Sequence, residues 1–247
     1  TDGDYSANTN DVSVLATRLS AIGNSTTGTV TVTNAVRVEG SQSDVTAALV
    51  TSGSMVEVSD AIVKITDSDF SANTNNVTIA ASDLKNIGNA TTGTVTLDGA
   101  VRISGNAADV TAALVTSGSK VVAGKSGTIA NVTSTVTASQ GAGYTTINNV
   151  NATFSSGVED STANLTKSAT AISDNLDAVT NFDGSTDITI TDGDYSANTN
   201  DVSVLATRLS AIGNSTTGTV TVTNAVRVEG SQSDVTAALV TSGSMVE

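Results

Sequence analysis

The chain has 247 residues and a formal net charge of −14 at pH 7, and it contains no Cys, His, Pro or Trp. This composition excludes disulfides, histidine–metal sites, thiol nucleophiles and a histidine general base. The acidity argues against nucleic acid and anionic membrane surfaces as partners, and no apolar run is long enough to cross a membrane.

Short alternating strands and short helices are expected along the whole chain. Alternation predicts strands around Val30 and Val32, Val36 and Val38, Val77 and Ile79, Val95 and Leu97, Val101 and Ile103, and Ile188 and Ile190. Helical segments are expected at Ser43 (SDVTAALV), Ser82 (SDLKNIG) and Ser173 (SDNLDAV), with Ser82 as an N-cap and Gly88 as a stop signal. Arg37, Arg102 and Arg227 are expected to be exposed to solvent. The apolar residues of the strands are expected to be buried, and so are Leu84 and Ile87 of the predicted helix.

The sequence repeats itself. Residues 1–57 and 191–247 are identical, which sets an offset of 190 residues, and residues from Thr66 align without gaps to those from Thr1. We divide the chain into module A (1–65), the homologous module B (66–127), the diverged module C (128–190) and a partial copy of A (191–247). Below, 1–57 is called the first copy and 191–247 the second copy. Identity of this kind predicts that the chain is part of a longer array of repeats.

These observations predict a β-rich repeat protein. Aromatic residues make up only 2% of the chain, so its core must consist of many similar aliphatic layers, as in a solenoid. We expect a parallel β-solenoid with short helical turns and about 20 to 22 residues per rung, estimated from repeat spacing. Tandem β-sandwich modules are the alternative, although a 65-residue unit is short for seven strands.

The stretches ATAISDNLDAVTNFDGSTDITITDGDYS and VTIAASDLKNIGN carry a family resemblance. They resemble the Asp-, Thr- and Ala-rich repeats of giant bacterial cell-surface and adhesin-like proteins. The resemblance covers most of the chain and implies a stalk, fibre or matrix component outside the cell. The strict Gly-Gly-x-Gly-x-Asp nonapeptide of calcium β-rolls is not present.

Three Asp doublets are the candidate metal ligands. They are Asp2 and Asp4, Asp67 and Asp69, and Asp192 and Asp194. Their spacing matches the opening of a calcium loop, but the Gly and Glu that a helix–loop–helix site needs are out of register. Weak calcium binding and solvated turns are both interpretations of this pattern.

The favoured function is a structural segment of a long extracellular filament, stalk or matrix fibre, without enzymatic activity. Its partner would be the chain itself, by end-to-end continuation and lateral bundling, with no insertion into membranes. A calcium-dependent adhesin segment and a solenoid polysaccharide enzyme are the alternatives. No catalytic residue or organic cofactor is predicted, because the sequence has no nucleophile elbow, phosphate loop or dinucleotide motif.

Overall fold

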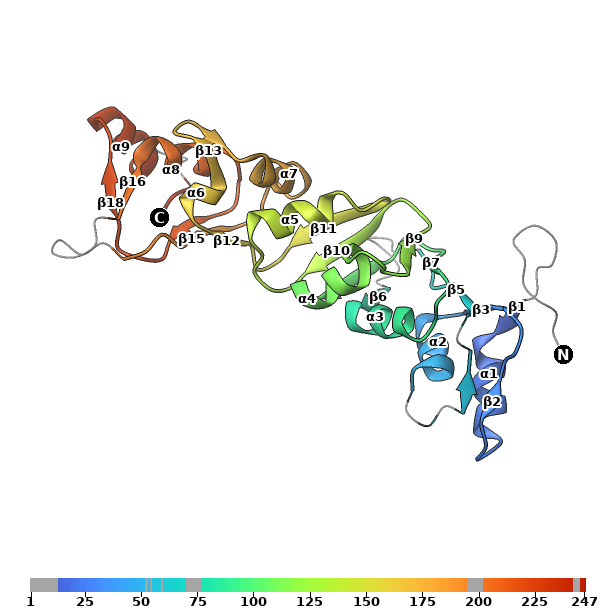
Figure 1. Cartoon of the computed structure of the whole chain (residues 1–247). Helices are drawn as coiled ribbons and strands as arrows, with labels where there is room; N and C mark the ends of the chain where they lie inside the picture. The colour runs from blue at the N-terminus through green and yellow to red at the C-terminus, as the bar shows by residue number, and fades with distance from the viewer. Residues whose placement is uncertain are drawn as a thin grey trace. The chain divides into compact units, whose positions relative to one another are not determined.

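A computed structural model describes residues 13–51, 53, 55–58, 60–69, 77–194, 202–241 and 245–247. The chain divides into two compact units, one formed by residues 1–130 and 147–151, the other by 131–146 and 152–247. Figure 1 follows the elements from blue to red along the chain.

The first unit contains parallel strands that pair in chain order. Its strands are β1 (Ser13–Leu15), β2 (Val30–Thr31), β3 (Arg37–Gly40), β4 (Val56–Glu57), β5 (Ile62–Ile65), β6 (Thr78–Ala80), β7 (Val95–Leu97), β8 (Arg102–Gly105) and β9 (Val121–Ala123). One sheet has the order β1-β3-β5-β7-β9, while β2 pairs with β4 and β6 with β8. Every pairing is parallel, so each strand adds to the edge left by an earlier one.

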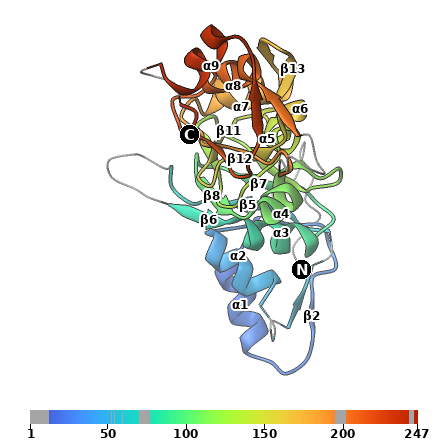
Figure 2. The same cartoon turned by 90° about the vertical axis from the view of Figure 1, so that its left-hand side faces the viewer.

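Short helices connect these strands. They are α1 (Ala16–Asn24), α2 (Gln42–Leu49), α3 (Ala81–Asn89), α4 (Ala107–Val110) and the π-helical η1 (Thr111–Val115). α1 lies against α2, as Figures 1 and 2 both show, and α2 lies against α3. Such short helices are marginal alone, and their apolar faces are stabilised by packing.

The second unit uses the same kinds of elements. They are α5 (Ala138–Thr145), β12 (Val158–Asp160), α6 (Thr162–Leu165), β13 (Thr166–Ser168), β14 (Ala171–Ile172), α7 (Asp174–Phe182), β15 (Ile188–Ile190), β16 (Ser203–Leu205), α8 (Ala206–Gly213), β17 (Val220–Val222), β18 (Arg227–Glu229) and α9 (Gln232–Leu239). β12, β15 and β17 form a parallel sheet, β16 pairs with β18 in parallel, and β13 with β14 is antiparallel. β10 (Thr128–Val132) and β11 (Val150–Phe154) each contribute residues to both units.

The architecture is therefore mixed α/β with several parallel sheets. Helices contain more of the described residues than the expectation of a β-rich protein implied. Paired residues lie 24 positions apart for β1 and β3 (Ser13 and Arg37) and 32 apart for β5 and β7 (Val63 and Val95), which is longer than the expected 20 to 22. Each of these connections contains, besides its helix, a strand that pairs elsewhere, β2 in the first and β6 in the second, which lengthens it.

The core is aliphatic, as the composition predicted. Val36, Val38, Leu84, Ile87, Val95 and Leu97 are buried, while Val30 and Val32 are only half-buried. Arg227 is exposed, and Arg37 and Arg102 are half-buried, with Arg37 Nε 2.6 Å from the Glu39 carboxylate. The predicted orientation is confirmed for the six buried residues and for Arg227, whereas the half-buried Val30, Val32, Arg37 and Arg102 lie between the two predicted classes.

The helix boundaries differ from the prediction at three points: α2 is capped by Ser41 and already includes Ser43, Gly88 lies inside α3 and does not end it, and the start of α3 is also different. Ser82 is not an N-cap, because α3 starts at Ala81 immediately after β6 and Ala80 occupies the cap position. Ser173 does cap α7, accepting a hydrogen bond from the Leu176 N–H at 3.2 Å. A strand that runs straight into a helix leaves no room for a separate capping loop.

Leu84 tests the packing of α3. Its side chain is fully buried, so Leu84→Ala should lower the free energy of unfolding by about 2 to 4 kcal/mol through the cavity it leaves. Leu15→Ala is the matched control, because Leu15 is 47% exposed, and it should have an effect below about 1 kcal/mol. Urea unfolding followed by circular dichroism gives both values; equal effects would contradict the packing described.

Candidate functional site

Aspartates that follow strands hold the N-termini of neighbouring helices. β5 pairs with β3, and β3 leads into α2, so Asp67, two residues beyond the end of β5, lies beside the first turn of α2. Its carboxylate accepts the Gln42 N–H at 2.7 Å. The N-terminal N–H groups of a helix have no intrahelical acceptor and carry partial positive charge, so a carboxylate there is stabilising.

The same contact occurs twice in the second unit. Asp192 follows β15 and accepts both the Thr162 N–H (2.8 Å) and the Thr162 hydroxyl (3.0 Å) at the start of α6. Asp160, at the end of β12, accepts the Ala138 N–H of α5 at 3.2 Å. Each of these carboxylates therefore connects two segments that lie side by side through their strands. Sequence reasoning missed Asp160, which is itself the last residue of β12 in the diverged module C.

The predicted calcium ligands are thus distributed among different contacts. Asp67 and Asp192 bind helix N-termini, whereas Asp69 accepts the Ala100 N–H at 2.9 Å and pairs with Lys125. The hydrogen bonds from Lys125 and Ala100 hold the pKa of Asp69 below its usual range, against the opposing effect of desolvation. Asp194 is exposed.

Asp2 and Asp4 lie outside the described residues. Within the described ranges, no three acidic side chains gather in a group that could hold a metal ion. Calcium binding therefore stays a prediction from sequence.

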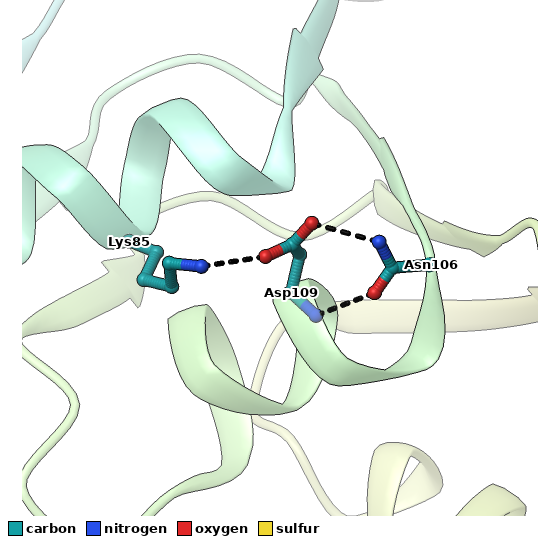
Figure 3. A network of polar contacts seen from close by, with 3 residues as sticks. All are labelled: Lys85, Asn106 and Asp109. Carbon is teal, nitrogen blue, oxygen red and sulfur yellow. Dashed lines mark hydrogen bonds and ion pairs between the residues drawn. The ribbon is translucent and has the colours of Figure 1, made fainter.

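An ion pair joins α3 to α4 in the first unit, and sequence reasoning did not find it. Lys85 Nζ lies 2.7 Å from Asp109 Oδ1. Figure 3 shows Lys85 pointing at Asp109, while Asn106 contacts the same aspartate twice. The Asn106 amide donates to Asp109 Oδ2 at 2.9 Å, and Asn106 Oδ1 accepts the Asp109 N–H at 2.9 Å. Asn106 is the N-cap of α4, so the ion pair is attached to a capped helix end.

Glycines mark places where two segments approach closely. A Cβ atom at Gly93 would lie 2.3 Å from the Ala61 carbonyl oxygen, and one at Gly218 would lie 2.5 Å from that of Ser185. Both glycines belong to a TTGT motif, and the same motif occurs at Gly28. A Cβ atom at Gly28 would meet only the Thr26 hydroxyl, 3.6 Å away. The motif therefore fits a backbone contact that the first copy does not make among the described residues.

The two identical copies have the same internal register. Val14 pairs with Val38 in the first and Val204 with Val228 in the second. The Val30 N–H donates to the Met55 carbonyl at 2.6 Å, and the corresponding bond from Val220 to Met245 has the same length. Differences in burial between the copies must therefore come from what packs against each.

We define a leading face by Ile22 and Val30 in the first copy and by Ile212 and Val220 in the second. Neighbouring segments cover this face in the second copy but not in the first. Ile212 and Val220 are fully buried, because α8 packs on α6, β13 and β14 and because β17 pairs with β15. Ile22 is 50% exposed and Val30 half-buried. One sequence thus has an open and a covered leading face in the same chain.

The trailing face shows the reverse. It is defined by Val38 and Val45 in the first copy and by Val228 and Val235 in the second. Val38 and Val45 are fully buried beneath β5 and α3, whereas Val228 and Val235 are half-buried. Val240 of the second copy is 72% exposed. These two faces are candidate contact surfaces between successive segments of the chain, because each has a neighbouring segment packed against it in one of the copies.

The leading face predicts unequal effects of one substitution at two identical positions. Ile212→Ala should destabilise the chain by about 2 to 4 kcal/mol, since it removes a fully buried side chain. Ile22→Ala, at the half-exposed equivalent, should cost less than about 1 kcal/mol. Urea denaturation of the two variants measures the difference, and similar losses would show that the neighbouring segment does not cover Ile212.

The helix contact of Asp192 predicts a second difference. Asp192→Ala removes a charged acceptor from two hydrogen bonds and should cost about 2 kcal/mol. Asp194→Ala, in the same doublet but exposed, should leave the free energy of unfolding within about 0.5 kcal/mol. Thermal unfolding of both variants gives the comparison; a larger effect at Asp194 would contradict the assigned roles.

The Lys85–Asp109 pair predicts a pH dependence. The hydrogen bond from Lys85 is the largest cause of the lowered pKa of Asp109; desolvation opposes it, and the Lys85 charge and Asn106 add to it. A carboxyl whose folded pKa is lowered stabilises the fold above its unfolded pKa, and this stabilisation is lost as the pH falls through the folded value. An NMR titration should give a low midpoint for Asp109 that rises in Lys85→Met. An unchanged midpoint in Lys85→Met would contradict the ion pair, and high salt serves as the screening control.

Calcium binding has a direct test. If the Asp doublets are ligands, millimolar calcium should raise the thermal midpoint of the chain and EDTA should lower it. Sodium chloride at equal ionic strength controls for general screening of the acidic chain. A midpoint that responds equally to both salts would leave the doublets as hydrogen-bond acceptors only.

Helices able to cross a membrane do not occur in the described parts of the chain. Comparison of the chain with protein-family models, curated proteins and solved structures gave no match.

Proposed function

We propose that this chain is a structural segment of a long extracellular filament, stalk or matrix fibre built from stacked tandem repeats. The observation that carries the proposal is the order β1-β3-β5-β7-β9, in which each new parallel strand joins the edge left by an earlier one. A chain built in this way lengthens its sheet as residues are added. Further modules would extend the same stack, which is the finer, solenoid interpretation of the fold.

The side-chain contacts between segments support the same role. Asp67, Asp160 and Asp192 each attach one segment to the helix N-terminus of its neighbour, and Lys85 with Asp109 joins two helices. Their common effect is to hold successive segments together. The proposed partner is therefore more of the same chain.

An extracellular location is part of the proposal. It is supported by the resemblance to cell-surface repeats and by an acidic composition rich in Thr, Ser, Asn and Gly. A high negative charge keeps a repetitive protein soluble and opposes non-specific association between neighbouring fibres.

Chains carrying one, two and three of the 190-residue periods test the structural role. Small-angle X-ray scattering should give a maximum dimension that rises in proportion to the number of periods. Gly218→Val should shorten or bend the particle, since its side chain would collide with the Ser185 and Thr186 carbonyl oxygens, while Gly28→Val is the matched control in open space. Compact particles whose size grows only with the cube root of mass would overturn the filament proposal.

A further inference from the structure

We propose that a pocket in the first unit, formed by α3, η1 and the turn at 116–120, binds a sugar acid, a ligand in which one carboxylate accompanies several ring hydroxyl groups. The inference goes beyond the proposed structural function and does not depend on it. Its evidence is the charge, the polar groups and the size of the pocket, whose wall consists of described residues only.

The pocket is large enough for a single sugar ring. It has a volume of about 400 Å³ and lies between the C-terminal part of α3 and η1. Small-molecule sites in proteins commonly enclose about 300 to 1,000 Å³. Leu84 and Val121 contribute apolar surface to its wall, and Asn89, Ser117 and Ser119 contribute amide and hydroxyl groups. Such a wall suits a ring that has both C–H and hydroxyl surfaces.

Lysine supplies the charge of this pocket. Lys120 lines it, is half-buried and has no ion-pair partner among the described residues. No Asp or Glu lines the pocket, although the chain has 24 acidic residues. The other four lysines of the chain each pair with an aspartate; they are Lys64, Lys85, Lys125 and Lys167. A half-buried ammonium group without a carboxylate partner favours an anionic ligand.

The turn that carries Lys120 is held in place by hydrogen bonds on both sides. The Ser119 hydroxyl donates to the Ala113 carbonyl of η1 and accepts the Val121 N–H at 3.3 Å. The Lys120 carbonyl accepts the Val95 N–H of β7 at 2.8 Å. The backbone position of Lys120 is therefore fixed without a ligand, which reduces the entropy lost on binding.

The helix ends decide which anion fits. α3 ends at Asn89 and η1 at Val115, and the last carbonyl groups of a helix carry partial negative charge and have no acceptor role within the helix. These carbonyls accept hydrogen bonds from hydroxyl groups and repel a second anionic group. The net charge of −14 also disfavours dianions such as phosphate. One carboxylate for Lys120 and hydroxyls for the carbonyls are together the functional groups of a sugar acid.

The charge of the pocket belongs to module B. The gapless alignment of the modules places Ser20 and Met55 of module A at the positions of Lys85 and Lys120. The charge of Lys85 is already compensated by Asp109, whose carboxylate lies 2.7 Å away, so Lys120 is the residue to test. Lys120→Met removes its charge and introduces the side chain that the homologous position carries.

Titration of the intact chain with D-glucuronate, followed by ¹H–¹⁵N NMR, tests the site. The amide signals of Asn89, Ser117 and Lys120 should shift in a saturable manner. Lys120→Met should bind about tenfold more weakly or not at all, because the partner of the carboxylate is lost. Lys125→Met is the matched control: it removes the same charge from an exposed lysine outside the pocket and should keep the affinity. Equal affinity of Lys120→Met and the unmodified chain, or no shift at the three residues, would overturn the inference.

Two simpler ligands test the chemistry on the unmodified chain and so do not depend on a variant that folds. D-glucose lacks the carboxylate and acetate lacks the ring hydroxyls, and each should bind about tenfold more weakly than glucuronate. Binding of either as tight as that of glucuronate would overturn the assignment to a sugar acid. A glucuronate trisaccharide distinguishes the sources of this ligand. Tighter binding than the monomer indicates a polysaccharide, and weaker binding indicates a free sugar acid; both agree with the inference.

Discussion

Parallel pairing between strands that lie 24 to 32 residues apart is the constraint on which the rest of the structure depends. It forces a helix or loop into every connection, because parallel neighbours cannot be joined by a tight turn. It also places the residue that follows one strand beside the helix that follows the previous strand. The acidic caps at Asp67, Asp160 and Asp192 are therefore consequences of the register.

This arrangement makes burial a property of neighbours more than of sequence. Ile22 and Ile212 occupy the same position in identical sequences, yet one is half-exposed and the other fully buried. Val38 and Val228 differ in the same way at the opposite face. At both faces the apolar side chains are fully buried only where a neighbouring segment packs on them.

The Asp67 contact with the helix N-terminus depends on the parallel strand pairing, since a neighbouring strand without a carboxylate at that position would leave the Gln42 N–H unpaired.

The sequence by itself determined which side of several strands faces inward, the aliphatic core and the placement of several helices. Alternation at Val36 and Val38 and the spacing of Leu84 and Ile87 are local signals, and local signals suffice to say which side of an element turns inward. Tertiary structure alone decided which strand pairs with which, and hence what the Asp doublets contact. Asp67 reaches the N–H of Gln42, 25 residues away, and the pair of Lys85 with Asp109 spans 24. No local pattern encodes such contacts, because they follow from the length of the connections between paired strands, and those lengths were longer than the repeat spacing implied.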